Sequence, residues 1–259
     1  MDILNSFQKA VDRHLSLRSY PIAIKFLKRT EELPPNIGRP ARDLGETIRP
    51  CVGWHLARHS GLPVAMLLDD FTTACPSGVF VFGLMAPTPA WLEGDLSCGI
   101  YSATREAAVN MEKHVFRLEV GSYAGVAFAP LGKVNFTPDL IMTFCNSNDA
   151  RRLIVASAWD TGEPLKVSIS GRDLCSEAIV QPFLSQKPAL AIPCRGDRQH
   201  GATHDDEIVF TTPMAKLAGI VTGLEEFEKS HRVEYLGEET ELQRRYKEMA
   251  KMLDAKLGR

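Results

Sequence analysis

Cysteines are the residues of this sequence whose types and positions are most informative about chemistry. Six cysteines occur in 259 residues, and no two of them have the CxxC spacing that is commonest in zinc and ferredoxin sites. Cys51, Cys75 and Cys175 each stand where a helix is expected to begin. The free N–H groups and the dipole of a helix start stabilise a thiolate, which is the form that binds metal or acts as a nucleophile. These positions therefore favour thiolate chemistry.

The other three cysteines have different settings. Cys194 ends a predicted strand and enters the loop Arg195-Gly-Asp-Arg198. Cys145 lies at a strand end, and Cys98 belongs to no recognisable motif. Because free cysteine is often buried as a small hydrophobe, we interpret Cys98 and Cys145 as structural.

Periodicity predicts the elements that must position these cysteines. Apolar residues at helical spacing predict a helix over 2–17, and a further helix is expected to start at Pro50-Cys51. The remaining pattern predicts strands at 21–27, 64–68, 123–129, 140–145, 165–170, 189–194 and 208–211, and helices at 103–116, 147–159, 175–184, 213–227 and 238–257. Residues 28–48 contain several prolines and predict an irregular connection. The expected fold is a single mixed α/β domain, residues 1–259, with short strands alternating with helices and cysteines at helix N-termini.

Five short motifs occur in order along most of the chain, from about residue 15 to 225. They are Pro21-Ile-Ala-Ile-Lys-Phe, Arg49-Pro-Cys51, Cys75-Pro-Ser-Gly78, Cys175-Ser-Glu-Ala-Ile-Val, and Pro193-Cys194-Arg-Gly-Asp-Arg198 followed by Asp205-Asp-Glu-Ile208. This ordered set resembles the uncharacterised ArCR family, a domain of unknown function from archaea and anaerobic bacteria. The resemblance implies that Cys51, Cys75, Cys175 and Cys194 are the family's cysteine positions, whereas Cys98 and Cys145 match none of its motifs.

An anaerobic setting and four dispersed cysteines favour a [4Fe–4S] cluster, in which each iron takes one protein thiolate. We therefore predict that Cys51, Cys75, Cys175 and Cys194 bind one cluster. Such a cluster with four thiolates is negatively charged, and nearby guanidinium groups would offset that charge. The candidates for this cofactor-binding role lie one to four residues from the cysteines: Arg49, Arg172, Arg195 and Arg198. Ordinary surface solvation is the alternative for these arginines.

Histidines provide weaker candidates for metal binding. His200 and His204 precede an acidic run and could bind a metal, although a solvated loop is the more common meaning of this pattern. His55 and His59 are four residues apart on one predicted helix face, but no glutamate lies between them as in a zinc hydrolase HExxH motif.

Composition limits the partners. The formal net charge is −2 and no long basic run occurs, so nucleic-acid binding is not expected. No segment is apolar enough to cross a bilayer, and residues 1–17 resemble an amphipathic helix rather than a signal peptide, so we expect a cytoplasmic protein without a membrane partner. The charged helix at 238–257 is expected to be peripheral or to form an oligomer interface, as in a homodimer.

Three functional alternatives remain open beside an iron–sulfur protein that exchanges electrons with a redox partner protein or a small molecule. The chain could be a non-enzymatic ligand-binding or regulatory module with structural cysteines. It could be an enzyme that uses a helix-start cysteine as nucleophile. It could also hold a structural zinc ion.

Overall fold

A six-stranded sheet forms the centre of the molecule. The computed structural model describes residues 3–28, 33–231 and 239–257. The strand order is β2-β3-β1-β4-β6-β5, and every neighbouring pair is antiparallel. The strands are β1 (Ile22–Leu27), β2 (Val64–Leu67), β3 (Gly125–Pro130), β4 (Leu140–Cys145), β5 (Ala189–Ala191) and β6 (Ile208–Pro213). The predicted mixed class, with short strands and intervening helices, is confirmed.

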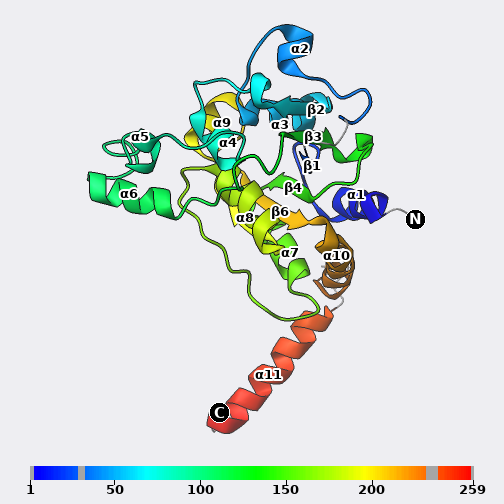
Figure 1. Ribbon diagram of the computed structural model, residues 1–259. Helices are drawn as coiled ribbons and strands as arrows, with labels where there is room; N and C mark the ends of the chain where they lie inside the picture. Colours follow the sequence, from blue (N-terminus) through cyan, green and yellow to red (C-terminus); the bar gives the residue numbers. More distant parts are fainter. Residues whose placement is uncertain (1–2, 29–32, 232–238, 258–259) are drawn as a thin grey trace.

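Helices surround this sheet (Figure 1). The longer ones are α1 (Ile3–His14), α3 (Pro50–Ser60), α6 (Arg105–Lys113), α7 (Ser147–Ser157), α10 (Leu217–His231) and α11 (Glu241–Leu257). The shorter ones are α2 (Pro40–Leu44), α4 (Pro76–Val81), α5 (Pro89–Leu92), the π-helix η3 (Cys175–Val180), α8 (Gln181–Ser185) and α9 (Arg195–His200). Three single-turn 3₁₀ segments, η1 (Leu68–Asp70), η2 (Leu131–Lys133) and η4 (Met214–Lys216), complete the described elements.

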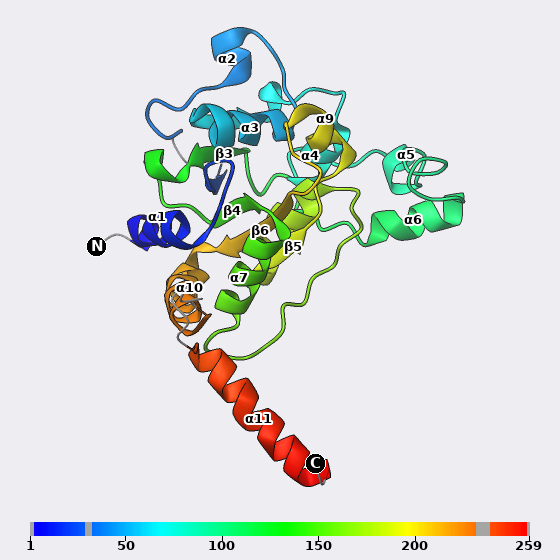
Figure 2. The ribbon, with the colours of Figure 1, turned by 180° about the vertical axis from the view of Figure 1, so that it is seen from behind.

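The two faces of the sheet bury different helices, as Figures 1 and 2 show from opposite sides. Side chains alternate along each strand, so Ile22, Ile24 and Phe26 of β1 join one hydrophobic cluster while Ala23 joins the other. The first cluster includes residues of α3, α4 and η3, and the second includes residues of α1, α7 and α10. The predicted cysteine-bearing helices therefore belong to the first face.

Three local predictions are wrong. Residues 165–170 alternate in polarity like a strand, but they are largely exposed and pair with no strand, and the Ser170 N–H donates to the Glu177 carboxylate instead. The loop predicted at 195–198 is the first part of helix α9, in which the Arg198 N–H donates to the Cys194 carbonyl oxygen. The connection at 28–48 contains the helix α2, which starts at Pro40 as proline at a first helical position favours.

The predicted C-terminal helix is present as α11 and extends away from the sheet (Figure 2). The first residue of the prediction, 238, lies outside the described residues, as does residue 2 of the predicted N-terminal helix. Within the part of the chain that the structure describes, no helix has the length and apolar character needed to cross a membrane.

Candidate functional site

All four predicted cysteine ligands lie at the start of a helix. Cys51 is the second residue of α3, and Cys175 is the first residue of η3. Cys75 directly precedes α4, and Cys194 directly precedes α9. The helix-start prediction is therefore confirmed for Cys51, Cys75 and Cys175, and it extends to Cys194, for which the sequence predicts a strand end and a loop.

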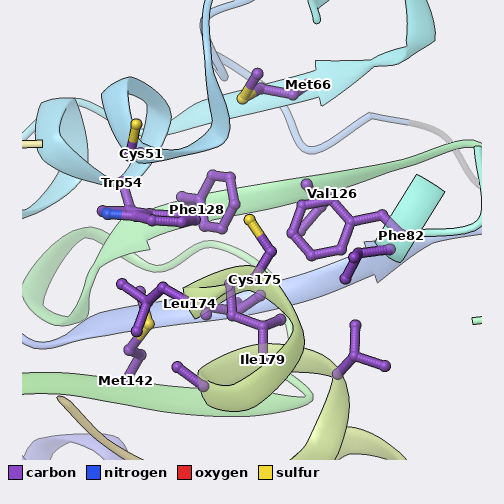
Figure 3. Close-up of a cluster of buried hydrophobic side chains, with 14 of the residues drawn as sticks. Cys51, Trp54, Met66, Phe82, Val126, Phe128, Met142, Leu174, Cys175 and Ile179 are labelled. Carbon is purple, nitrogen blue, oxygen red and sulfur yellow. The ribbon is translucent and has the colours of Figure 1, made fainter. Parts of the chain in front are cut away.

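These four cysteines line one cavity of about 350 Å³. Cys51 and Cys175 are buried, and Cys75 and Cys194 are half-buried. Figure 3 shows Cys51 and Cys175 within the same buried cluster as Trp54 and Phe128, although they come from different segments of the chain. The fold thus brings together four residues that are far apart in the sequence.

Cys75 and Cys194 occupy the same position relative to a helix, although their backbone conformations differ. Each is the residue before a six-residue helix. Burial raises the pKa of the Cys75 thiol, whereas the backbone amide of Gly78, three residues on, acts to lower it. Burial likewise raises the pKa of Cys194 to about 11, against the effect of the amides of Leu174 and Asp197. Backbone amides therefore face both sulfurs, but burial dominates.

The four thiols also oppose one another's ionisation. Burial raises the pKa of Cys175 well above its ordinary value, and the charges of Asp173, Cys75, Cys194 and Cys51 raise it further. Burial raises the pKa of Cys51 in the same way, with contributions from Asp197, Cys75 and Cys194. In the metal-free protein these thiols are therefore protonated at neutral pH.

Two buried aspartates connect the cysteine-bearing segments in pairs. Asp173 accepts from the hydroxyl of Ser77, and from the backbone N–H of Ser176 at 3.3 Å, so it joins the segments of Cys75 and Cys175. Burial is the largest influence on Asp173 and raises its pKa. The carboxylate therefore positions two cysteine segments while tending toward its neutral form.

Asp197 has the equivalent place between the other two segments. It accepts from Trp54 Nε1 on α3 at 2.6 Å and from the Thr203 hydroxyl. Burial raises the pKa of Asp197 too. Because Trp54 stands on the helix of Cys51 and Asp197 on that of Cys194, this bond fixes the two cysteines relative to each other.

Neither aspartate is among the candidates that the sequence indicates. Asp173 and Asp197 belong to no pattern of metal-ligating or catalytic residues. The available signals are proximity, since Asp173 lies two residues before Cys175 and Asp197 three residues after Cys194, and the position of Asp197 inside the motif at 193–198.

The predicted arginines fall into three situations. Arg49 and Arg195 line the cavity, and neither side chain has a hydrogen-bond or ion-pair partner among the described residues. Arg172 lines the cavity as well but pairs with Glu112, Nη2 to Oε1 at 2.7 Å. Arg198 lies outside the cavity lining and pairs with Asp205 at 3.2 Å. The structure therefore brings Arg49, Arg172 and Arg195 to the cysteines and leaves Arg198 at a separate ion pair.

Cys98 and Cys145 lie apart from the four. Cys145 faces the second hydrophobic cluster, on the other side of the sheet, and burial raises its pKa to about 12. Cys98 lies in the loop between α5 and α6 and does not line the cavity. Their interpretation as structural residues agrees with these positions.

The histidines form no complete ligand set. His55 and His59 lie with their ring centres 4.9 Å apart, and His55 Nδ1 lies 3.2 Å from the Gly201 carbonyl oxygen. His200 contributes to the lining of the cysteine cavity. Throughout residues 3–28, 33–231 and 239–257, no three His, Cys, Asp or Glu side chains are grouped closely enough to hold a metal ion. A single-ion site has no preassembled ligand set in this part of the chain.

The fold and the site define a class of protein, a mixed helix-and-sheet chain with a cavity lined by four cysteines. The chain belongs to the family described as uncharacterised ArCR, whose model matches residues 10–223. It is 27% identical over 209 residues to an uncharacterized protein of Methanocaldococcus jannaschii, covering 80% of this chain and 87% of that relative. No solved structure matches the chain. Helix α11 lies outside the family match.

Proposed function

We propose that the chain binds one [4Fe–4S] cluster through Cys51, Cys75, Cys175 and Cys194. Its role is electron transfer or redox chemistry on a small molecule. The observation that carries the proposal is the convergence of four cysteines from four separate segments on one cavity. Cys98 and Cys145, which match no family motif, are also the two that stay outside it.

The electrostatics of the cavity suit four thiolates only when a positively charged metal core accompanies them. Burial raises the pKa of all four thiols, and the neighbouring cysteines raise it further for Cys51 and Cys175. An iron core would supply the positive charge that stabilises four buried thiolates, as a metal does for coordinating cysteines generally. Arg49 and Arg195, whose side chains lack partners among the described residues, would offset the remaining negative charge of the cluster.

The described residues weigh against one zinc ion at this site. Zinc requires its four sulfurs about 2.3 Å from one centre, and no such compact group occurs in the described residues. A cubane is larger, and the sulfurs of its four cysteine ligands are separated by about 6 to 7 Å.

A cysteine-nucleophile enzyme is less well supported. A nucleophilic cysteine needs a lowered pKa, usually from a neighbouring cation or base. At this site burial raises the pKa of all four thiols. A redox partner protein or a small molecule remains the expected partner, and a homodimer through α11 is compatible with the chain.

The test is purification of the full chain without oxygen, followed by reconstitution with iron and sulfide. We expect a brown protein with about four irons and four sulfides per chain. Serine variants of Cys51, Cys75, Cys175 or Cys194 should each lose most of the iron. Cys98→Ser and Cys145→Ser are the matched controls and should retain it.

Three outcomes would overturn the proposal. A chain that stays colourless and metal-free after reconstitution would favour the ligand-binding module. A chain that retains only zinc would favour a structural metal site. Loss of iron from Cys98→Ser or Cys145→Ser would show that the ligand set is wrong.

A further inference from the structure

The cysteine cavity has a second group of lining residues that supply no ligand to the cluster. Trp91, Leu96 and Tyr101 come from the segment between the start of α5 and the end of α6, residues 89–113, and Arg172 precedes η3. The segment carries none of the four cysteine ligands, yet it forms part of the cavity wall. The group combines aromatic surface with a cation.

The Arg172 side chain is fixed by its neighbours, and one of its nitrogens donates to no acceptor among the described residues. Its side chain is only 7% exposed, and Glu112, 1% exposed, pairs with its Nη2. Glu112 is itself fixed by the Ser97 hydroxyl, which donates to Oε1 at 2.5 Å. Arg172 Nη1 has no hydrogen-bond partner among the described residues. A buried N–H without a partner is costly, so the guanidinium lacks one acceptor within the protein, and Nη1 itself has almost no accessible surface.

Aromatic rings flank the same guanidinium. Its central carbon lies 5.7 Å from the ring centre of Trp91 and 5.7 Å from that of Tyr101. Trp91 is buried and supports the cation, whereas Tyr101 is 42% exposed and leaves part of its ring open. An apolar, flat molecule could cover that open ring.

We propose that the cavity binds a planar organic carboxylate. The Arg172 guanidinium pairs with the carboxylate, the Tyr101 ring covers its flat body, and Arg49 supplies a second positive charge beside the cysteines. This inference rests on the proposed function for the chemical role of the bound carboxylate. Binding of the carboxylate itself can be measured in the metal-free protein.

The chemistry of these groups selects this ligand class. The planar guanidinium matches the geometry of a carboxylate, and charge-assisted hydrogen bonds are the stronger kind. Aromatic side chains prefer stacked or edge contacts with flat apolar groups. Glu112 offsets part of the Arg172 charge, which favours a monoanion over a polyphosphate. A cavity of about 350 Å³ suits a small molecule.

The experiment titrates the full chain with benzoate and follows tryptophan fluorescence. The sequence has three tryptophans, and two of them, Trp54 and Trp91, line the cavity. A Trp159→Phe background removes the third, so the signal reports the cavity. The titration is made on metal-free and on iron-reconstituted protein, with benzamide as the uncharged comparison.

Variants separate ligand binding from folding. Arg172→Gln combined with Glu112→Gln removes both buried charges together and should weaken benzoate binding at least about tenfold. Tyr101→Ala changes a partly exposed side chain and should also weaken it. Arg105→Gln is the control, because this exposed arginine of the same segment pairs only with Glu93 and Asp95 among the described residues.

The outcomes are distinct from those of the iron test. Binding of benzoate but not benzamide, lost in the Arg172 and Tyr101 variants and kept in Arg105→Gln, supports the proposal whether or not iron is bound. Equal binding to all variants, equal binding of benzamide, or no binding of benzoate, cinnamate or nicotinate would overturn it. A chain that binds iron but none of these carboxylates would retain the proposed function and lose this inference.

Discussion

A substitution at Gly78 tests how closely two of the cysteine-bearing segments must approach. Gly78 is the third residue after Cys75, and Pro50 directly precedes Cys51. A Cβ at Gly78 would overlap Cγ of the Pro50 ring and lie 3.1 Å from its Cδ. Gly78 has no positive φ, so the position needs glycine for space and not for backbone conformation.

The expected cost of Gly78→Ala is the difference between two effects. Forcing a methyl group into a packed contact costs about 1 to 3 kcal/mol, because the proline ring cannot move aside as a flexible chain would. Alanine regains about 0.5 to 1 kcal/mol through its better helix propensity. The net loss should be about 0 to 2.5 kcal/mol, which lowers Tm by up to roughly 10 °C in a chain of this size.

Urea unfolding of the metal-free chain measures this loss. Gly132→Ala is the matched control, since a Cβ there meets no atom within 4 Å and the residue has no positive φ. Pro50→Ala in the Gly78→Ala background should remove the overlap and recover about 1 kcal/mol relative to the sum of the single variants. Iron content after reconstitution should fall in Gly78→Ala and recover in the double variant. The reasoning is refuted if Gly78→Ala is as stable as Gly132→Ala, or if the two substitutions add without coupling.

Three further predictions concern buried charges and thiols. Glu207→Gln should lower the free energy of unfolding by about 3 to 5 kcal/mol, because the buried Arg58 guanidinium loses its anionic partner at 2.7 Å. A urea midpoint equal to that of the wild type would contradict this. The folded-state pKa of Cys175 is raised by burial, so its contribution to stability is complete below the ordinary thiol pKa of 9.0 and is lost as pH rises above that value. Metal-free protein should therefore lose stability above about pH 9, and Cys175→Ser should flatten that slope; an unchanged slope would exclude Cys175 as its source. Cys145→Ser should cost about 1 kcal/mol, because it places a hydroxyl in a buried site, whereas Cys98→Ser at a half-buried site should change the unfolding midpoint less.

The sequence predicts the helices and strands well where the apolar periodicity agrees with the residues that begin and end an element. Strand β4 coincides with the apolar run at 140–145. Helix α7 is present where it is predicted, but its cap is Asn146 and not Ser147 or Asn148, because Asn146 accepts from the N–H groups of Asn148 and Asp149. The segment 165–170 shows where periodicity fails. Its polar and apolar residues do alternate, but a strand also needs a neighbouring strand with backbone N–H and C=O groups available for pairing. Here the Ser170 N–H donates to the Glu177 carboxylate instead.

Helix α9 shows the opposite failure, in which tertiary contact overrides local propensity. Gly196 and the short polar run 195–198 indicate a loop. The bond from Trp54 to Asp197 anchors the segment to α3, 143 residues earlier in the chain. A contact of this separation leaves no local signal, so the helix could not be predicted from the residues around it.

The same distinction explains which parts of the site could be predicted. Cysteine is rare, and placement at a helix start selects Cys51, Cys75 and Cys175, to which the family resemblance adds Cys194. Asp173 and Asp197 are of a common type, and their importance comes from the segments that they join. Residues that supply chemistry can thus be recognised by type, whereas residues that position them emerge only when distant segments meet.

Because the two aspartates connect the cysteines in pairs, their replacement should loosen one pair at a time. Asp197 accepts from Trp54 and Thr203, so Asp197→Asn should disturb Cys51 and Cys194 more than the other two cysteines. Alkylation of the native, metal-free chain with iodoacetamide, followed by mass spectrometry of its peptides, measures this difference thiol by thiol. Asp173→Asn is the matched comparison and should accelerate the labelling of Cys75 and Cys175 instead, because its bonds run to Ser77 and Ser176. Equal acceleration at all four cysteines in either variant would mean that the cavity loosens as one unit, and the pairwise connection would then be wrong.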